Sequence, residues 1–533
     1  MKLVHLDCTL RDGGYYNNWN FDKDMVESYL QSMKDIKVDY VELGFRSIST
    51  KGFKGPYAHT TDDFINTLKI PKSLKIGVMV NASDLFKPGN TPIGNAKKLF
   101  GSKKNSPVSL IRFACHGHEF KKTIAVCDWL KSKGYKVGIN LMQISEMTEE
   151  AIKEFSEAAS RSNLDVFYFA DSLGSIIPDD MKSIVKSIKT YWNGDIGIHT
   201  HDNLGLAMNN SIEAIKSGVS WIDSTVTGMG RGPGNLQTEY AILEFKDIIL
   251  RKPNISSLTK MIKTFFTPLQ KHYEWGKNPY YYLSGKYKIH PTYIQEMLSD
   301  DRYDDNDVLS LIDYLKKVGG KKYSKDNVIN SRALFTKRNT STWEPAKIIT
   351  NKDVLIIAPG ASVKEHVEGI EQYIKKNRPI VLALNTTKCI NENLINFRVA
   401  CHPYRMIADT KDYKSLKQPL ITPYSQLSDD LQKDLKSVKK YDFGIGIGGK
   451  FAFGVKKCSI PLPLVFAYSL GIATSGKAKK IFLAGFDGYE SDDPRRSEMD
   501  QLLSIYSLNN KSKEIISLTP TKYKINTFSL YGL

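Results

Sequence analysis

The stretches Asp7-Cys8-Thr9-Leu10-Arg11-Asp12-Gly13-Gly14 and His199-Thr200-His201-Asp202-Asn203 each lie at the end of a short apolar run. Such runs predict buried β-strands. Side chains at positions i and i+2 of a strand point to the same side, so His199 and His201 can face one point. Asp12 adds a carboxylate and Arg11 a positive charge. Two imidazoles and one carboxylate around an open position predict a catalytic divalent-metal site, and hence an enzyme.

Strand-like runs alternate with amphipathic helical patterns through the first half of the chain. The predicted strands are Leu3–Leu6, Tyr40–Phe45, Leu74–Val80, Leu110–Cys115, Lys136–Met142, Val166–Ala170, Ile196–His199 and Trp221–Val226. The predicted helices between them include Asp24–Ile36, Lys121–Lys133, Thr148–Ser160, Asp179–Tyr191 and Asn209–Lys216. This α/β pattern, repeated over about 250 residues, predicts a (β/α)8 TIM barrel. A doubly wound open sheet is the alternative, which the absence of a glycine-rich dinucleotide turn disfavours.

The chain of 533 residues is too long for one core. We expect the barrel over residues 1–250, a helical, aromatic-rich appendage with a linker over 251–345, and a Rossmann-like α/β domain over 351–533. The appendage includes Trp275 and Pro279-Tyr280-Tyr281-Tyr282, and the sequence leaves open whether it covers the mouth of the barrel. The polar residues 337–342 are the predicted linker.

In the last segment, Val354–Ala358, Ile380–Leu384 and Ile481–Ala484 are the predicted strands. The turn containing Gly360 and Ser362 follows the first of them and precedes a helix. Helix N-terminal amides bind anions, so we predict phosphate binding at Gly360 and Ser362.

The composition limits the classes of partner. The net charge is +18, but the lysines are spread along the chain, which favours a solvated basic surface, with anionic substrates as the alternative and nucleic acid as the least favoured partner. The six cysteines lack CxxC spacing, which indicates reduced thiols and a cytoplasmic protein. The chain begins with a strand and not a signal peptide, and no apolar run approaches the roughly 18 residues of a membrane span.

Five motifs in the first 250 residues occur in a characteristic order. They are Thr9-Leu10-Arg11-Asp12-Gly13, Val41-Glu42-Leu43-Gly44, Asp171-Ser172-Leu173-Gly174, His199-Thr200-His201-Asp202-Asn203 and Gly228-Met229-Gly230-Arg231-Gly232-Pro233-Gly234-Asn235. The segment resembles the metal-dependent lyases and aldolases that include hydroxymethylglutaryl-CoA lyase, isopropylmalate synthase and especially 4-hydroxy-2-oxovalerate aldolase. The resemblance implies a carbon–carbon lyase or aldolase that acts on a 2-oxo acid and an aldehyde through a pyruvate-like enolate.

The resemblance also implies a metal-binding role for Asp12, His199 and His201, with Asn235 as a further ligand or a loop contact. Oxygen and imidazole donors suit Mn²⁺, Mg²⁺, Co²⁺ or Zn²⁺, and a hard chelating substrate favours Mn²⁺ or Mg²⁺. As an alternative, Asn235 could cap the last helix of the barrel, because asparagine is a preferred N-cap residue.

Two further roles follow from the same resemblance. Arg11 would stabilise the enolate oxygen as charge develops there, and Glu42 would hold Arg11 in place. The alternative for Glu42 is a glutamate on a surface loop.

The chain departs from these relatives at the proton carrier. The 4-hydroxy-2-oxovalerate aldolases have a catalytic histidine shortly after the Arg-Asp-Gly segment, where this chain has Tyr15 and Tyr16. Tyr15 is one candidate, and His116 and His118, after the fourth predicted strand, are others. The reactive cysteine of the lyases is absent, and the second half is unlike the regulatory domain of isopropylmalate synthase. These differences disfavour the lyase and the synthase. They leave an aldolase whose aldehyde substrate is not assigned.

The stretches Val354–Lys364 and Ile481–Gly488 are similar to segments of bacterial sialyltransferase-like surface-glycan proteins. That resemblance implies binding of a nucleotide sugar and a role in surface-polysaccharide precursor biosynthesis, and it allows a bifunctional enzyme with a transferase-like domain. The alternative function is a glycosyltransferase whose barrel is only a scaffold. We also expect a homo-oligomer.

Overall fold

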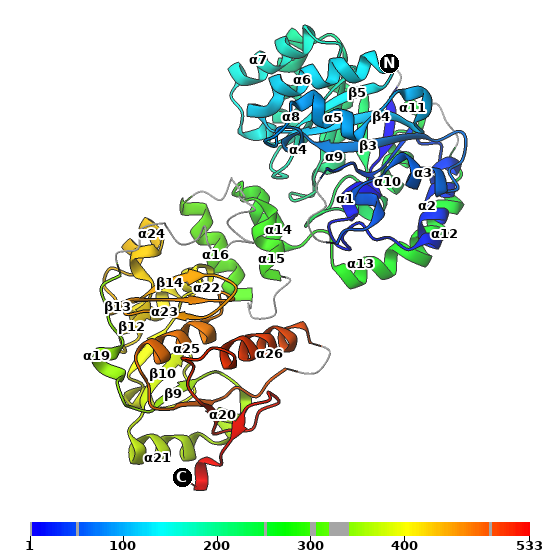
Figure 1. Cartoon of the computed structure of the whole chain (residues 1–533). Coiled ribbons are helices and arrows are strands. Elements are labelled where there is room, and N and C mark those ends of the chain that lie inside the picture. The colour runs from blue at the N-terminus through cyan, green and yellow to red at the C-terminus, as the bar shows by residue number, and fades with distance from the viewer. Residues whose placement is uncertain are drawn as a thin grey trace. The chain divides into compact units, whose positions relative to one another are not determined.

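The computed structural model describes residues 3–48, 53–249, 253–298, 305–318, 341–489 and 493–532. Of these, the residues up to 298 form one compact unit and those from 305 onward form another (Figure 1). Helix α16 (Asp305–Val318) contacts α22 (Pro403–Ala408) and so belongs to the second unit. The domain boundaries expected from the sequence stay a prediction, and residues 337–340 of the predicted linker lie outside the described residues.

The first unit is a closed parallel barrel of eight strands in sequential order, which confirms the predicted TIM barrel. The open-sheet alternative is wrong, because β1 pairs with both β2 and β8. The strands are β1 (Val4–Asp7), β2 (Tyr40–Phe45), β3 (Lys75–Asn81), β4 (Val108–Cys115), β5 (Lys136–Leu141), β6 (Val166–Asp171), β7 (Asp195–Thr200) and β8 (Trp221–Ser224). Only β8 separates β7 from β1, so the ends of these two strands are neighbours.

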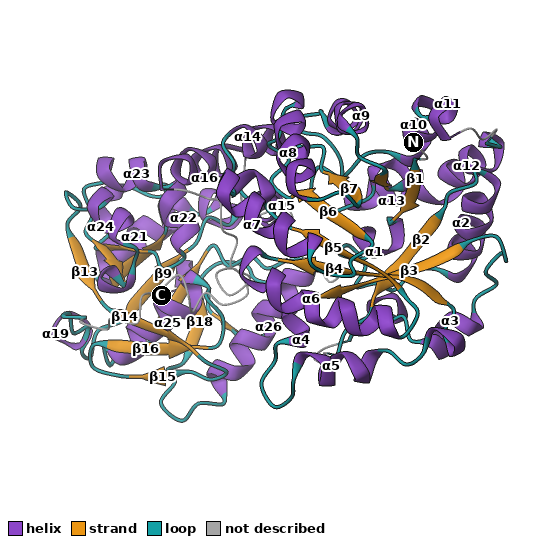
Figure 2. Cartoon of the chain, turned by 90° about the horizontal axis from the view of Figure 1, so that it is seen from above, coloured by secondary structure: helices purple, strands orange, loops and turns teal. Residues whose placement is uncertain are grey.

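Helices surround the strands (Figure 2). They are α1 (Thr9–Gly13), α2 (Lys23–Asp35), α3 (Asp62–Thr67), α4 (Ala82–Leu85), α5 (Pro92–Leu99), α6 (Gly117–Ser132), α7 (Glu149–Ser160), α8 (Pro178–Tyr191), α9 (Ala207–Ser217), α10 (Thr238–Glu244) and α11 (Lys246–Ile249). Short 3-10 turns lie at η1 (Pro56–Ala58), η2 (Lys103–Asn105), η3 (Ile144–Glu146) and η4 (Val226–Gly228). Successive strand residues alternate between this helical layer and the barrel interior. In β2, Val41 and Leu43 join the core beneath the helices, whereas Tyr40 packs inside the barrel with Tyr168 and Trp221.

The predicted helical appendage begins with α12 (Ile255–Met261), a π-helical turn η5 (Ile262–Phe266), α13 (Thr267–Tyr273), α14 (Pro279–Lys286) and α15 (Pro291–Leu298). It contacts the loops after β7 and β8. Asn203 donates from its side-chain amide to Ser284 Oγ at 3.0 Å, and the Trp275 indole donates to the Thr227 carbonyl at 3.1 Å. The segment from Trp275 to Ser284 therefore lies on the carboxyl-terminal face of the barrel, where the site loops are, whereas α12 packs against α2.

The second unit contains an eight-stranded parallel sheet in the order β13-β12-β11-β10-β9-β17-β18-β19. Its strands are β9 (Val354–Ile357), β10 (Ile380–Leu384), β11 (Phe397–Val399), β12 (Leu420–Thr422), β13 (Lys440–Asp442), β17 (Ile481–Ala484), β18 (Ile515–Ser517) and β19 (Asn526–Thr527). The described helices and helical turns around it are α16, α19 (Ala346–Ile349), α20 (Ala361–Glu365), α21 (Val367–Asn377), η6 (Glu392–Leu394), α22, α23 (Thr410–Ser415), η7 (Tyr424–Gln426), α24 (Asp429–Asp434), α25 (Val465–Ser475), α26 (Pro494–Ser507) and η8 (Leu530–Gly532). This confirms a second α/β domain.

The central strand β9 is apolar along its whole length because helices cover both faces of this sheet. Val354 and Ile356 pack in one core with α25 and α26, and Leu355 and Ile357 pack in another with α21. A small separate sheet joins β14 (Gly444–Ile447), β15 (Ala452–Phe453) and β16 (Lys457–Ile460). In the described part of the chain, no helix has the length and apolar character that crossing a membrane requires.

Candidate active site

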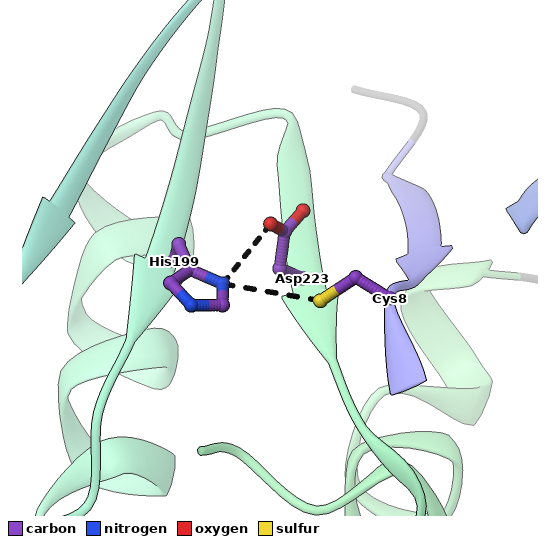
Figure 3. Close-up of side chains that lie close together, drawn as sticks. All are labelled: Cys8, His199 and Asp223. Carbon is purple, nitrogen blue, oxygen red and sulfur yellow. Dashed lines mark hydrogen bonds and ion pairs between the residues drawn. The ribbon is translucent and has the colours of Figure 1, made fainter. Parts of the chain in front are cut away.

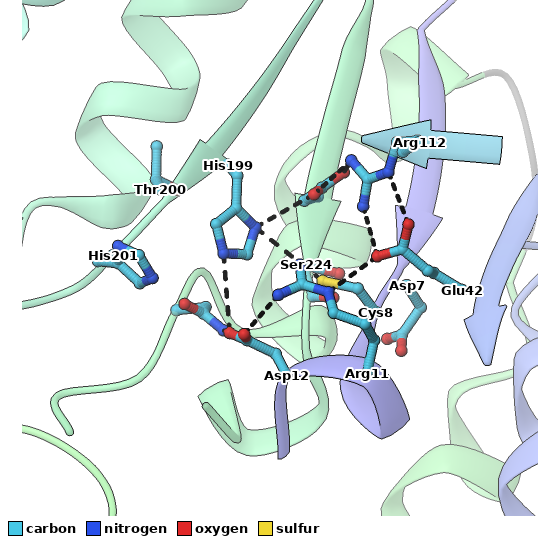
Figure 4. A network of polar contacts seen from close by, with 12 residues as sticks. Asp7, Cys8, Arg11, Asp12, Glu42, Arg112, His199, Thr200, His201 and Ser224 are labelled. Atoms are coloured by element: carbon cyan, nitrogen blue, oxygen red, sulfur yellow. Dashed lines mark hydrogen bonds and ion pairs between the residues drawn. The ribbon is translucent and has the colours of Figure 1, made fainter. Parts of the chain in front are cut away.

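Asp12, His199 and His201 meet at the carboxyl-terminal face of the barrel (Figure 4). Asp12 lies in α1 directly after β1, His199 lies in β7, and His201 follows β7. One donor atom of each lies within 4.8 Å of the others, and Asp12 Oδ2 is 3.7 Å from His199 Nε2. The structure thus brings together the three residues that the sequence proposed as metal ligands.

Each imidazole is oriented through its Nδ1 atom. His199 Nδ1 lies 3.1 Å from Asp223 Oδ2, and His201 Nδ1 lies 2.7 Å from the backbone carbonyl of Asp171. Since both partners accept hydrogen bonds, each Nδ1 carries a proton, and Nε2 is the ring atom left to bind a metal ion.

Asn235 belongs to the same cluster. Its backbone forms a β-bridge with His201, and its side-chain amide donates to Asp12 Oδ2. Its Oδ1 atom is buried and has no hydrogen-bond partner. The helix-cap alternative is wrong, because α10 begins at Thr238 and its N-cap residue is Gln237. An orphaned buried amide oxygen next to a carboxylate and two imidazoles fits a site for a divalent cation.

Arg11 and Glu42 lie beside the cluster, and both are buried. Arg11 Nε donates to Glu42 Oε2 at 2.9 Å, and Nη1 donates to Asp12 Oδ1. The Nη2 atom is buried without a hydrogen-bond partner. The surface-loop alternative for Glu42 is wrong, since this residue is 0% exposed within β2. Arg11 therefore presents a fixed, unsatisfied donor next to the metal-ligating atoms.

Arg112 lies deeper in the barrel and was missed by sequence reasoning. It is fully buried in β4, where it donates to both oxygens of Glu42 at 2.8 and 2.7 Å and to both oxygens of Asp223 at 3.0 and 2.8 Å. Its guanidinium also stacks over the ring of Tyr168 in β6. The signal was present in the sequence, because Arg112 and Asp223 are charged residues inside otherwise apolar strand runs.

One layer of the barrel interior is formed by Glu42 of β2, Arg112 of β4, Tyr168 of β6 and Asp223 of β8. This is expected, because alternate strands contribute the side chains of a layer. The neighbouring strand β7 has Gly197 beside Tyr168. A Cβ atom at Gly197 would lie 2.4 Å from the Tyr168 ring. The glycine therefore makes room for the aromatic ring that supports Arg112.

Cys8, His199 and Asp223 form a second close group (Figure 3). Cys8 Sγ is 4.0 Å from His199 Nδ1 and donates to the Ser224 carbonyl. Burial raises the pKa of the thiol well above its ordinary value. In this group, Asp223 pairs with Arg112 and accepts from His199 Nδ1, so it orients the His199 ring.

The electrostatics of the cluster keep two of the three ligands, Asp12 and His201, deprotonated. For His199, burial opposes the charged form, but the hydrogen bonds with Asp12 and Asp223 raise its pKa above the ordinary value. Burial opposes ionisation of Asp12, but Arg11 and the neighbouring histidines hold the pKa of this carboxyl well below its ordinary value. Burial and the adjacent His199 lower the pKa of His201 to about 3. At neutral pH the site thus contains an ionised carboxylate and a neutral imidazole, the forms that bind cations.

The predicted proton carriers lie around the mouth of the barrel. Tyr15 is 38% exposed, packs edge-on against Trp19 and Phe45, and has Arg231 over its ring. His116 is half-buried at the N-cap of α6, and its backbone amide donates to Glu119 Oε2 at 2.9 Å. Within the described residues, neither side chain forms a hydrogen bond with Asp12, His199 or His201.

His290 is a further candidate that sequence reasoning missed. It is buried between α14 and α15. Burial, with further contributions from Arg231, His201 and His116, holds its pKa well below the ordinary value. His290 is therefore a neutral imidazole at neutral pH. The sequence around His290 contains aromatic residues but no motif that would have indicated a functional histidine.

Asp171, Asp202 and Asn203 organise loops. The Asp171 carboxylate accepts from the amides of Ser175 and Ile176, as a residue that starts a turn does. Asp202 accepts from the Ala207 amide and pairs with Lys277 at 2.9 Å. These side chains shape the rim around His201, whereas Asp223 and the Asp171 carbonyl orient the imidazoles.

In the second unit, the turn proposed for phosphate binding has a partner within the chain. The Ser362 amide donates to Asp487 Oδ2 at 2.9 Å, and the Ser362 hydroxyl donates to Oδ1 of the same carboxylate. Gly360 is packed closely against Gly485. Phosphate binding at Gly360 and Ser362 stays a prediction, and it would require an anion to displace Asp487 from this turn.

The barrel, its site motifs and sequence comparison define the class of protein. A family model described as HMGL-like matches residues 111–261, and the chain belongs to the HMGL-like family. Among known relatives, the 4-hydroxy-2-oxovalerate aldolase of Geobacillus genomosp. 3 is 28% identical over 238 residues, which cover 44% of this chain and 68% of that protein. The oxaloacetate decarboxylase of Mycobacterium tuberculosis is 25% identical over 238 residues, with the same coverage.

A solved structure is similar as well. The N-terminal domain of a candidate aldolase from Bacteroides vulgatus is 33% identical, with a TM-score of 0.51, and the match covers 56% of this chain and 98% of that chain.

Proposed function

We propose that the barrel is a divalent-metal-dependent carbon–carbon lyase or aldolase that acts through the enolate of a 2-oxo acid. The observation that carries this proposal is the convergence of Asp12, His199 and His201 at strand ends, beside the unpartnered Nη2 atom of Arg11. Such an arrangement can hold a chelating substrate and stabilise negative charge on its oxygen.

Asp12, His199 and His201 would hold the ion, with Asn235 Oδ1 as a further donor. Mn²⁺ or Mg²⁺ suits the oxygen donors and a hard chelating substrate best, with Co²⁺ or Zn²⁺ as alternatives. When bound, the ion supplies Lewis-acid polarisation of the substrate carbonyl.

Arg11 would donate from Nη2 to the enolate oxygen. Glu42 fixes the Arg11 side chain at Nε, so the donor is aimed before the charge develops and needs little reorganisation. The buried position of Arg11 strengthens this interaction, because few water molecules compete for it.

The relatives' names are consistent with this chemistry. Cleavage of a 4-hydroxy-2-oxo acid and decarboxylation of oxaloacetate both leave the enolate of a 2-oxo acid. Of the two, we favour the aldolase reaction, because several similar relatives and the solved domain that is 33% identical are described as aldolases. The proton carrier would be His116, Tyr15 or the buried neutral His290.

Deuterium exchange into the methyl group of pyruvate tests the proposal, because enolate formation precedes any reaction with an aldehyde. The protein loaded with Mn²⁺ or Mg²⁺ should exchange these protons, and Asp12→Asn and His199→Ala should abolish the exchange. Asp179→Asn is the matched control, since Asp179 is exposed in the first turn of α8. Full exchange in both site variants would contradict the assignment.

The other predictions from the sequence rest on composition, on the resemblance of two segments of the second unit, and on the pairing of two domains. They are a cytoplasmic location, a homo-oligomer, nucleotide-sugar binding by the second unit, and a role in surface-polysaccharide precursor biosynthesis. The glycosyltransferase alternative likewise stays a prediction. Binding of CMP- or UDP-sugars by the full chain would be its first test.

A further inference from the structure

Arg231 lies on the loop after β8, between two glycines that fix the loop against the site. Gly230 packs so closely that a Cβ atom there would lie 2.7 Å from Asp12 Oδ2 and 2.3 Å from Asn235 Nδ2. The Gly232 amide donates to the Tyr16 hydroxyl at 3.1 Å. The backbone on both sides of Arg231 is therefore held next to the metal-ligating residues.

The Arg231 side chain is half-buried, and its guanidinium carbon is 5.2 Å from the centre of the Tyr15 ring. Its electrostatic neighbours include Tyr16, Tyr281, His201 and His290, none of which is an anion at neutral pH. Among the residues that the structure describes, no carboxylate pairs with Arg231 and no acceptor takes a hydrogen bond from its guanidinium.

Other arginines of the barrel are paired. Arg11 and Arg112 bind Glu42, and Arg46 binds Asp62 at 2.6 Å. Even Arg161, which is 78% exposed, lies 3.2 Å from Glu157. A guanidinium carries five donors in a planar fork that matches a carboxylate or a phosphate. An unpaired one in the mouth of a barrel is thus set up to receive an anion.

We propose that Arg231 binds an anionic group, a carboxylate or a phosphate, on the carbonyl compound that reacts with the 2-oxo acid. This inference rests on the proposed function. Arg11 is buried beside the metal ligands, whereas Arg231 stacks on the exposed ring of Tyr15, farther toward the solvent. Arg11 would therefore bind the 2-oxo acid. Arg231 would bind the anionic group of the aldehyde, at the end remote from its carbonyl.

In the condensation direction, the enolate carbon bonds to the carbonyl carbon of the aldehyde, and the carbonyl oxygen takes a proton. Cleavage reverses these steps. Arg231 takes no part in bond making, and it holds the remote end of the aldehyde so that the carbonyl meets the enolate.

Condensation of pyruvate with matched aldehydes tests the inference. Succinic semialdehyde is compared with butanal, and glyceraldehyde 3-phosphate with glyceraldehyde, so that the two pairs distinguish carboxylate from phosphate. We expect at least one anionic aldehyde to have a kcat/KM about tenfold or more above its neutral counterpart. Arg231→Met should reduce that ratio about tenfold or more, because the charged hydrogen bonds are lost.

Two further variants sharpen the result. Arg231→Lys keeps the charge but lacks the planar fork, so an intermediate ratio is expected. Arg161→Met removes an exposed arginine of α7 and should leave the ratio unchanged.

The pyruvate exchange assay separates the possible failures. If the wild-type protein exchanges pyruvate protons but does not distinguish the matched aldehydes, the inference on Arg231 is wrong and the proposed function stands. If Arg231→Met instead raises the KM for pyruvate and leaves the aldehyde ratio unchanged, Arg231 binds the 2-oxo acid and the inference is overturned. Absence of exchange in the metal-loaded wild-type protein overturns both.

Discussion

Arg112 and Glu42 form a doubly hydrogen-bonded ion pair in the interior of the barrel, with both side chains fully buried. Through this pair, Arg112 in β4 fixes the carboxylate that holds Arg11. Its remaining donor, Nη1, binds Asp223, which orients His199. One residue therefore connects the proposed oxyanion donor with a proposed metal ligand.

Arg112→Met should reduce both metal affinity and pyruvate exchange. Groups that orient metal ligands typically contribute about 10- to 100-fold in affinity, and an uncompensated buried charge costs roughly 3–5 kcal/mol of stability. Titration calorimetry with Mn²⁺ measures the metal affinity, and the exchange assay measures enolate formation. Thermal unfolding measures the loss of stability.

The triple variant Arg112→Met, Glu42→Gln, Asp223→Asn separates stability from positioning. It leaves no unpaired charge in this layer, so stability should recover. Exchange should stay low, because Arg11 and His199 lose their orienting carboxylates. Recovery of full exchange in the triple variant would rule out a positioning role.

Gly197→Ala should destabilise the barrel by about 1–3 kcal/mol, because the new methyl group collides with the Tyr168 ring beneath Arg112. Denaturant unfolding measures this loss. Gly101→Ala is the matched control, since no heavy atom lies within 4 Å of the added Cβ there. Equal stability of the two variants would show that Tyr168 can move without cost.

Asn235→Asp should make the stability of the barrel depend more strongly on metal. Without metal, a second carboxylate next to Asp12 replaces a hydrogen-bond donor, and we expect a loss of roughly 1–3 kcal/mol. Saturating Mn²⁺ should restore the loss, because an ion that binds only the folded state stabilises it. The measurement is the melting temperature with EDTA and with Mn²⁺, with Asn235→Ala for comparison. If Mn²⁺ raised the melting temperature of Asn235→Asp no more than that of the wild-type protein, a cation at Asn235 would be contradicted.

The stability of the barrel should fall as the pH rises toward neutrality because of Asp171. Burial raises the pKa of this carboxyl to about 7, so the folded state holds a proton that the unfolded chain releases near pH 4. The contribution of protonated Asp171 to the stability of the folded barrel is complete below about pH 4. It is lost as the pH rises through about 7.

Asp171→Asn removes this dependence and keeps the contact with His201, which involves the backbone carbonyl. Between pH 5 and 8, the wild-type protein should lose about 3 kcal/mol relative to the variant, since each pKa unit corresponds to about 1.4 kcal/mol. If the free energy of unfolding of the wild-type protein and of the variant changed equally with pH across this range, Asp171 would be ionised throughout.

Much of the fold could be predicted from local patterns. The predicted strand Tyr40–Phe45 coincides with β2, and Ile380–Leu384 with β10. The ends of other strands differ by one or two residues, as for β8, which stops at Ser224 and not Val226. Hydrophobic periodicity fixes the interior of an element, whereas its ends depend on hydrogen bonds with neighbouring strands.

The sequence alone indicated the residues of the cluster, because strand spacing puts His199 and His201 on one side and Asp12 at the end of another strand. It could not decide whether Asn235 capped a helix or faced Asp12, since an asparagine serves both purposes equally well. Closure of the barrel decided this, by placing the loop after β8 against α1.

Only the tertiary structure revealed Arg112, Asp223 and the unpaired Arg231. Their roles depend on which side chains from distant strands and loops lie within hydrogen-bond distance, and no local pattern contains that information. The sequence determined where strands end and which chemical groups stand there. The closed barrel decided which of those groups meet, because hydrogen bonding of β8 to β1 brings Val4–Asp7 and Trp221–Ser224 together.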